Sequence, residues 1–345
     1  MLKKIAAGVA ALAVGAGAAI AVAANLSGAG ATFPAPVYAK WAEAYRAQTG
    51  NQLNYQAIGS GGGIRQINAN TVDFGASDKP LKPDDLATNG LIQFPTVIGG
   101  VVPVVNIPGV APGALKLTGP IVSDIFRGII VYWDDPHITA LNPGVSLPHL
   151  KITVVHRSDG SGTTFLFTTY LSMKARNWAA GPGGNDSVNW PTGIGGKGND
   201  GVAAFVRQTP GAIGYVEYAY AKQNHMTFTL LQNKAGKFVQ PLAANFAAAA
   251  AGANWAKAPG FYLLLLDQPA PDAWPITGAT FILVHTKQAN AQTGHDVLAF
   301  FDWAYKNGDA AAQGLDYVTF PESVKNLVRQ AWRKVVGPDG KPVYS

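Results

Sequence analysis

One stretch constrains the fold of this chain more than any other: Arg157-Ser158-Asp159-Gly160-Ser161-Gly162-Thr163-Thr164. The apolar run before it, 152–155, is typical of a buried strand, and the apolar spacing after it, 165–171, is typical of a helix. The first N–H groups of a helix have no partner within the helix, and the helix dipole is positive there. With the planar guanidinium of Arg157, this turn predicts a site for a small tetrahedral anion, and an ordinary capped turn is the alternative.

The same order of strand, polar turn and helix recurs twice near the N-terminus. A strand ending near Gly28 leads through Thr32 and Phe33 to a helix with one apolar face. The alternating strand 52–58 runs into the glycine-rich loop 59–63, and a helix over 64–70 follows. This loop is either a flexible turn or a second anion-facing nest of backbone N–H groups, with a serine hydroxyl as a further donor.

Two long extended runs indicate segments that pass between two lobes. The first, 91–107, is rich in β-branched residues and interrupted by Pro95 and Pro103, and proline excludes a central-strand role at those points. The second, 274–284, is again extended and apolar, and we interpret it as the return crossing. Asp78 ends a short strand just before a proline, a position where an aspartate is most often a cap or turn residue.

The composition excludes several classes of site. The 345 residues suffice for two domains, and 48% hydrophobic residues predict a sizeable core. Because the chain has no cysteine and its six histidines are scattered, we expect no disulfide, metal site or cofactor. The formal net charge of +6 comes without a dense basic run interleaved with aromatics, so nucleic acid is not an expected partner.

The N-terminus predicts export. A short positive region with Lys3 and Lys4 precedes an uncharged run of small residues, 5–24, that ends in an Ala-x-Ala pattern at 21–23. We therefore expect residues 1–24 to be a signal peptide cleaved near Ala23 or Ala24. A retained membrane anchor is the competing interpretation, because the uncharged run approaches the ~20 residues that span a bilayer.

Known nucleotide and hydrolase motifs do not fit the glycine-rich loops. The loop 59–63 lacks the Gly-Lys-Ser/Thr ending of a Walker A motif, and no dinucleotide fingerprint is present. The glycines around Ser161 do not form the G-x-S-x-G of a nucleophile elbow. The glycine-rich loop 195–201 resembles a phosphate loop only superficially. We interpret it as structural, with Asp200 capping a helix over 202–207.

Taken together, several separated motifs resemble the phosphate-binding proteins of bacterial ABC-type phosphate importers, and the resemblance covers essentially the whole chain after the signal. The motifs that carry it lie in the family's order, at 28–36, 55–63, 73–78, 159–163, 195–201 and 274–277. One departure is visible at Gly61, where family members often have a second serine. Region 229–265 is less family-like.

The resemblance implies an α/β fold of two mixed-sheet lobes, joined by two crossing strands, with the ligand in the cleft between them, as in type II-like periplasmic binding proteins. Lobe 1 would comprise residues 25–98 and 276–345, and lobe 2 residues 99–275. Carried over motif by motif, the phosphate contacts would be Thr32, Phe33, Ser60, Asp78, Arg157, Ser161, Gly162 and Thr163. Asp159 would orient the guanidinium of Arg157.

The resemblance also implies a function without catalysis. The protein would be a periplasmic monomer that binds inorganic phosphate and delivers it to the membrane permease subunits of the importer. A phosphate- or arsenate-binding sensor is an alternative, and a secreted phosphatase-like hydrolase is a weaker one. A carboxylate at Asp78 would repel an anion unless the ligand donates a proton, which hydrogen phosphate can do and sulfate cannot. Asp78 is therefore the predicted sulfate-rejecting residue.

Overall fold

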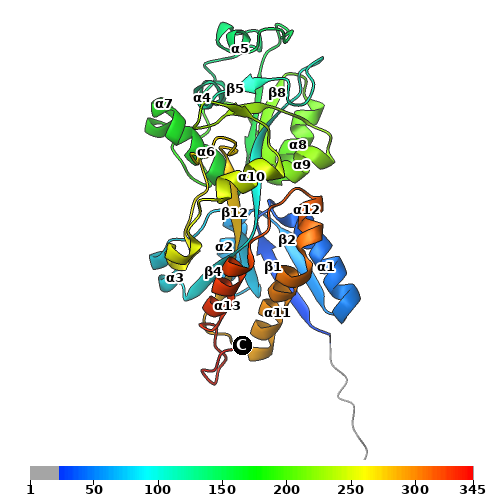
Figure 1. Cartoon of the computed structure of the whole chain (residues 1–345), viewed down its shortest axis with the longest axis vertical. Helices are drawn as coiled ribbons and strands as arrows, with labels where there is room; N and C mark the ends of the chain where they lie inside the picture. Colours follow the sequence, from blue (N-terminus) through cyan, green and yellow to red (C-terminus); the bar gives the residue numbers. More distant parts are fainter. Residues whose placement is uncertain (1–22, 345) are drawn as a thin grey trace, which may run out of the picture.

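The computed structural model describes residues 23–344, and it divides into two α/β lobes stacked along the long axis of the molecule (Figure 1). The two-lobed α/β architecture expected from the resemblance is confirmed. Apart from Ala23 and Ala24, the predicted signal peptide lies outside the described residues. Within residues 23–344, no helix has the length and apolar character needed to cross a membrane.

The lower lobe in Figure 1, lobe 1, contains both ends of the described chain. Its elements are β1 (Asn25–Gly30), α1 (Ala35–Thr49), β2 (Gln52–Ala57), α2 (Ser60–Asn68), β3 (Phe74–Ser77), α3 (Pro83–Thr88), the first part of β4 (Leu91–Val105), β12 (Thr277–His285), α11 (Ala291–Asn307), α12 (Asp309–Gly314) and α13 (Glu322–Trp332).

The upper lobe, lobe 2, begins in the second part of β4. Its elements are β5 (Lys116–Leu117), α4 (Gly119–Phe126), α5 (Pro136–Leu141), β6 (Thr153–Arg157), α6 (Gly162–Lys174), α7 (Arg176–Ala180), β7 (Ile194–Gly196), α8 (Gly198–Gln208), β8 (Ala212–Glu217), α9 (Tyr218–Gln223), β9 (Thr227–Phe228), β10 (Leu230–Gln232), β11 (Phe238–Val239) and α10 (Ala243–Ala250).

One sheet runs through both lobes in the order β2-β1-β3-β12-β4-β8-β6-β7, and β9 also pairs with β4. The strands β1, β2 and β3 are parallel, as are β6, β7 and β8, whereas β4 and β12 are antiparallel to their neighbours. Because parallel strands end at the same edge of a sheet, the turns after β1, β2 and β6 face the junction between the lobes. A separate three-stranded sheet has the order β11-β10-β5.

The long extended runs do cross between the lobes, as the sequence predicts. The prediction that Pro95 and Pro103 exclude a central strand is wrong, because both lie in β4, which is central in the sheet. Pro95 pairs with Phe281 where the register shifts, and Pro103 pairs with Tyr215. Strand β4 pairs with β12 through Gly100 and with β8 from Val101 onward. At this waist Gly278 lies opposite Gly99, and Thr277 opposite Gly100. A Cβ on Gly100 would lie 2.1 Å from the Phe246 ring, so side chains from the lobes fill the space that these glycines leave.

Three helices begin earlier than the sequence predicts. Helix α2 begins at Ser60 rather than at 64, and α6 begins at Gly162 with Ser161 as its N-cap. Helix α8 begins at Gly198 rather than at 202, and its N-cap is Lys197, so the prediction that Asp200 caps it is wrong. In each case glycines that read as turn residues form the first helical turn, because packing between the lobes outweighs their low helix propensity.

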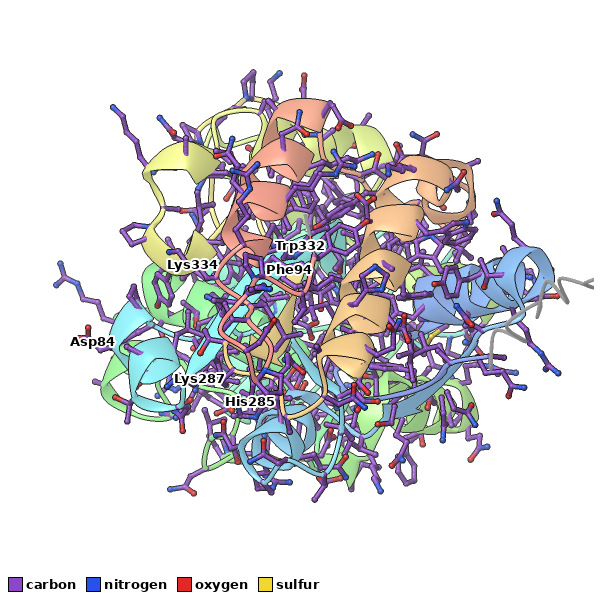
Figure 2. All side chains as sticks on the ribbon, turned by 90° about the horizontal axis from the view of Figure 1, so that it is seen from below. Asp84, Phe94, His285, Lys287, Trp332 and Lys334 are labelled. Atoms are coloured by element: carbon purple, nitrogen blue, oxygen red, sulfur yellow. The ribbon has the colours of Figure 1, made fainter. Side chains whose placement is uncertain are left out.

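The core of lobe 1 is aromatic. Phe94 of β4 and Trp332 of α13 meet edge to face with ring centroids 5.3 Å apart, near the middle of the view in Figure 2. Trp332 also stacks on Tyr305 of α11. These contacts pack the C-terminal helices α11 and α13 against the crossing strand β4, so the segment that re-enters lobe 1 forms part of its core.

We keep the lobe boundaries at 98/99 and 275/276 as a proposal. One segment inside the predicted lobe 2 packs against lobe 1 instead: the 3-10 turns Trp255–Lys257 and Pro259–Phe261. The Trp255 ring meets Phe320, and the Gly260 carbonyl accepts a hydrogen bond from Gln93 of β4. The segment lies beside α3 in Figure 1. The segment spans the waist on one side of the molecule.

Candidate functional site between the lobes

Lobe 2 contributes a buried arginine whose direction is fixed. Arg157 is the last residue of β6, and its Nε and Nη2 atoms donate to the two carboxylate oxygens of Asp159 at 2.7 and 2.5 Å. The Asp159 Oδ1 atom also accepts from the Gly198 N–H at 3.1 Å. Burial raises the pKa of Asp159, but these bonds and the Arg157 charge outweigh it and hold the pKa below its usual value. Asp159 therefore stays ionised and orients the guanidinium, as the resemblance implies.

The start of α6 lies directly beside this pair. The Ser161 Oγ atom accepts the Thr164 N–H at 3.0 Å, which leaves the Ser161 hydroxyl proton free to donate elsewhere. The third Arg157 nitrogen, Nη1, lies 3.4 Å from the Thr163 hydroxyl. Ser161 and Thr163 are fully buried. Lobe 2 thus presents hydroxyl groups, a helix N-terminus and a neutralised arginine at one place.

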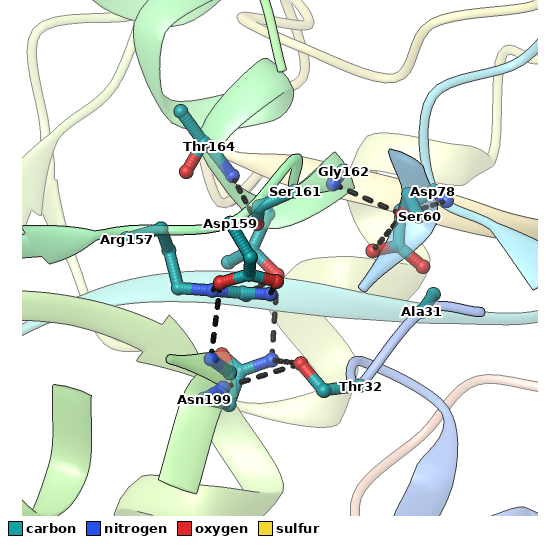
Figure 3. A network of polar contacts seen from close by, with 12 residues as sticks. Ala31, Thr32, Ser60, Asp78, Arg157, Asp159, Ser161, Gly162, Thr164 and Asn199 are labelled. Carbon is teal, nitrogen blue, oxygen red and sulfur yellow. Dashed lines mark hydrogen bonds and ion pairs between the residues drawn. The ribbon is translucent and has the colours of Figure 1, made fainter. Parts of the chain in front are cut away.

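Lobe 1 contributes a serine that reaches the opposite lobe. The Ser60 Oγ atom accepts hydrogen bonds from the Asp78 N–H at 3.2 Å and from the Gly162 N–H at 3.0 Å (Figure 3). The second bond joins α2 to α6 across the junction. A Cβ on Gly162 would lie 2.5 Å from the Asp78 Cβ, so only glycine allows this approach. In this closed arrangement the Gly162 N–H, a predicted phosphate donor, is shared with Ser60.

Asp78 is a buried carboxylate of lobe 1 at the junction, and one of its two oxygens has no hydrogen-bond partner among the described residues. Its Oδ2 atom lies 3.5 Å from the Ser60 hydroxyl, whereas its buried Oδ1 atom has no hydrogen-bond partner among residues 23–344. Burial raises the pKa of Asp78 to about 7, against the opposing effects of the nearby Thr280 hydroxyl and of Arg157 across the junction. A buried carboxylate oxygen without a donor is costly, and a ligand that brings a proton would remove the cost.

Thr32 and Phe33 lie in the turn between β1 and α1. Among the described residues, no acceptor receives the N–H of either residue, so both donors are available to a ligand. The Thr32 hydroxyl accepts bonds from Asn199 of lobe 2, from the backbone N–H at 3.2 Å and from Nδ2 at 2.6 Å (Figure 3). Asn199 Nδ2 also lies 3.4 Å from the Thr163 hydroxyl, which links Thr32 to the arginine side of the site.

Asn199 is the residue that sequence reasoning missed. The sequence predicts a structural loop at 195–201, yet the helix start there carries the Asn199 amide, which bonds Thr32 across the lobes. The Asn199 Oδ1 atom accepts the Glu217 N–H at 2.9 Å, so the side chain is held at both ends. A polar residue just after a glycine-rich turn was the available signal, the same one that marked Ser60 and Ser161.

The structure therefore brings all the predicted site residues together at one buried junction. Backbone N–H groups, hydroxyls and one guanidinium face a carboxylate, and the arrangement suits binding of a small protonated oxyanion. No cluster of three or more His, Cys, Asp or Glu side chains that could hold a metal ion occurs in the described part of the chain. Glu217 is a further buried carboxyl near the waist, and it accepts the Ala219 N–H at 2.8 Å.

Two α/β lobes joined by crossing strands, with a polar binding site buried between them, define the class of bilobal solute-binding proteins. The family model of the PBP superfamily domain matches residues 16–307. Relatives carry the assignment further. The chain is 53% identical over 321 residues to the phosphate-binding protein PstS of Pasteurella multocida, covering 93% of each chain. It is also 53% identical over 309 residues to that of Haemophilus influenzae, covering 90% of this chain and 92% of the relative.

The chain belongs to the PstS family of phosphate-binding proteins. Solved structures agree on the fold. A high-affinity periplasmic phosphate-binding protein (PfluDING), solved with bound phosphate, has a TM-score of 0.72 at 24% identity. The match covers 89% of this chain and 94% of that one. At this identity the match shows the two-lobed fold alone.

Proposed function

We propose that this protein binds inorganic phosphate between its lobes and delivers it to the permease subunits of an ABC-type importer. The observation that carries the proposal is the unpaired Oδ1 atom of buried Asp78, which lies in a junction rich in backbone N–H and hydroxyl donors. Family membership supports the same ligand, because the relatives are named phosphate-binding proteins. The eight predicted contact residues, with Asp159 behind Arg157, form the proposed site.

The chemistry needs no lysine cluster. Hydrogen bonds to a charged group contribute roughly 1.5–3 kcal/mol each, and a helix N-terminus contributes ~0.3–1 kcal/mol, up to ~2 when partly buried. A micromolar site requires only about 8 kcal/mol after the costs of ordering and closure. Since Asp159 neutralises the charge of Arg157, the site selects by donor geometry rather than by net positive charge.

The carboxylate of Asp78 gives the site its discrimination. An ionised carboxylate can accept the proton of hydrogen phosphate, but it faces only acceptor oxygens in sulfate. Arsenate carries the same proton, so this device separates it poorly from phosphate.

The location and the export signal belong to the same proposal. Solute-binding proteins of importers act outside the inner membrane, and the leader 1–24 has the charged start and Ala-x-Ala ending of a cleaved signal. We infer that the mature protein acts as a periplasmic monomer. Mass spectrometry of the periplasmic protein should give an N-terminus near Ala23 or Ala24, and a retained leader would contradict cleavage.

Calorimetric titration of the purified protein with phosphate, sulfate and arsenate tests the function. We expect micromolar or tighter phosphate binding and little or no sulfate binding at pH 8. Phosphate uptake at limiting concentration should fail when the gene is deleted, which distinguishes a transport component from a sensor. Turnover of phosphate esters without tight phosphate binding would instead indicate a hydrolase.

A further inference from the structure

Three successive backbone carbonyls beside the site each accept a tyrosine hydroxyl. The Ala31 carbonyl accepts from Tyr55, the Thr32 carbonyl from Tyr220, and the Phe33 carbonyl from Tyr317, each at 2.6 Å. The carbonyls are consecutive, but the tyrosines come from three separate parts of the chain. Such a concentration of strong donors on one turn exceeds what the turn needs to hold its shape, because the Thr32 carbonyl also accepts the Ala35 N–H at 3.2 Å.

The tyrosines come from both lobes. Tyr55 lies in β2 of lobe 1, and Tyr317 follows α12 in the same lobe. Tyr220 lies in α9 of lobe 2, so its bond to Thr32 exists only while the lobes are together. The Tyr317 hydroxyl also lies 3.0 Å from the Glu217 carboxyl of lobe 2. The turn that carries Thr32 and Phe33 therefore accepts hydrogen bonds from tyrosines of both lobes.

The pattern matters because a peptide group is one conjugated unit. The Ala31 carbonyl and the Thr32 N–H belong to the same peptide plane, as do the Thr32 carbonyl and the Phe33 N–H. A donor on the carbonyl draws charge from the N–H and makes it a stronger donor, the cooperative effect known from hydrogen-bond chains. The Phe33 carbonyl differs, because the next residue is Pro34 and that peptide plane has no N–H.

We propose that Tyr55 and Tyr220 are positioning residues that strengthen the two backbone N–H donors of Thr32 and Phe33 toward the bound anion. This inference rests on the proposed function, since it needs an anion at those N–H groups. Tyr220 acts only after closure, so it couples the approach of lobe 2 to the strength of a donor in lobe 1. Tyr317 holds the turn in place but has no N–H to act through.

The expected kinetic signatures differ between the two residues. Tyr220→Phe should weaken phosphate binding about tenfold, mainly through faster dissociation, because its bond is absent from the open form. It should leave the melting temperature of the phosphate-free protein unchanged. Tyr55→Phe should weaken binding to a similar extent and also lower that melting temperature, because its bond lies within lobe 1.

A graded replacement separates donor strength from shape. Site-specific incorporation of 3-fluorotyrosine and 3,5-difluorotyrosine at position 220 or 55 keeps the ring and makes the hydroxyl a stronger donor. Calorimetry with phosphate at pH 7 should then show affinity rising in the order Phe, Tyr, fluorotyrosine, difluorotyrosine. Each added fluorine should tighten binding by about twofold. The same series at Tyr317 should give a smaller gain, since Pro34 interrupts the transmission.

Tyr305 supplies the matched control. It is a buried tyrosine whose hydroxyl donates to a backbone carbonyl, that of Pro95, inside lobe 1 and away from the site. Fluorination at Tyr305 should leave phosphate affinity unchanged. A flat series at both 220 and 55 would overturn the inference, and so would a loss in Tyr→Phe with no gain on fluorination, which would indicate a purely structural role.

The outcome also separates this inference from the proposed function. If the unmodified protein fails to bind phosphate, the proposed function is wrong. If it binds phosphate normally and the series at 220 and 55 is flat, only the tyrosine mechanism is wrong.

Discussion

The two lobes equip the same site in opposite ways. In lobe 2 Asp159 neutralises the charge of Arg157 and accepts two hydrogen bonds from it, so this ion pair forms without a ligand. In lobe 1 the Oδ1 atom of Asp78 has no partner among the described residues. Burial affects both carboxyls, yet the pKa of Asp159 lies below its usual value and that of Asp78 rises to about 7. We infer that lobe 2 contributes mainly affinity, through the paired Arg157, and that lobe 1 contributes mainly discrimination, through the unpaired Oδ1 atom of Asp78.

Arg157→Ala should have the largest effect on phosphate affinity of the variants considered. It removes the guanidinium and leaves Asp159 without its partner, and breaking a buried ion pair costs ~3–5 kcal/mol. We expect phosphate affinity to fall at least about 100-fold in calorimetry. Arg207→Ala, which removes a surface arginine bonded to Asn224, is the control and should bind normally. A loss below tenfold in Arg157→Ala would show that lobe 2 does not dominate affinity.

Asp78→Asn should change selectivity rather than abolish binding. The amide can donate to an oxyanion, so sulfate meets a donor where it met an acceptor. We expect the ratio of phosphate to sulfate affinity to fall by about 10- to 100-fold. Asp84→Asn, on the exposed face of lobe 1, should leave the ratio unchanged. An unaltered ratio in Asp78→Asn would remove the discriminating role from lobe 1.

Lowering the pH should also weaken the discrimination against sulfate in the unmutated protein. Because the pKa of Asp78 is raised to about 7, the carboxyl becomes protonated as the pH falls through 7 and turns into a donor. Sulfate binding should therefore strengthen between pH 8 and pH 6, approaching tenfold per unit at most. Titrations across this range test it, and Asp78→Asn should show no such trend. Sulfate affinity independent of pH in both proteins would contradict the assignment.

Ser60→Ala sharpens the comparison by cutting the direct contact between the lobes. It leaves the buried N–H groups of Gly162 and Asp78 without their shared acceptor, at ~1–3 kcal/mol each. A ligand oxygen can replace part of this, so we expect phosphate to bind about tenfold more weakly. Ser27→Ala removes a hydroxyl that bonds Asp73 within lobe 1 and serves as the control. Equal affinities for the two variants would argue against Ser60 as a contact.

Gly61→Ser should give the smallest effect. The Gly61 N–H donates to the Gly160 carbonyl across the lobes at 2.9 Å, and a Cβ there would lie 3.1 Å from the Gly160 Cα. The lobes would have to separate by a few tenths of an ångström, so we expect binding to weaken about two- to fivefold. Gly252→Ser adds a side chain in open space and should bind normally. Tighter binding in Gly61→Ser would mean that the added hydroxyl joins the site.

The parts of the site that follow a strand could be predicted from the sequence. Thr32, Ser60 and Ser161 each lie at or just before a helix start, where backbone N–H groups lack partners within the helix, so the local pattern implies the chemistry. The starts of α2 and α8 could not be placed, because glycine has a low helix propensity and contacts with the other lobe decide the outcome.

The partners of the supporting residues could not be predicted from the sequence for another reason. Asn199 and Tyr220 act on Thr32 from far along the chain, and nothing near them in the sequence marks their partner. From the sequence, a buried tyrosine is predicted to be a core residue whether or not its hydroxyl donates a functional hydrogen bond. Only the folded chain shows that their polar ends meet on one turn.

The waist of the molecule has a mechanical consequence. Besides the paired strands β4 and β12, the segment with Trp255–Lys257 and Pro259–Phe261 also spans the waist, so separation of the lobes has to deform both this segment and the antiparallel ribbon. The facing pair Gly99 and Gly278 carries no side chains, and the side chains of Phe33 and Leu166 pack directly against the ribbon there. On the proposed function, the resistance of this ribbon to twisting would offset part of the binding energy whenever phosphate draws the lobes together.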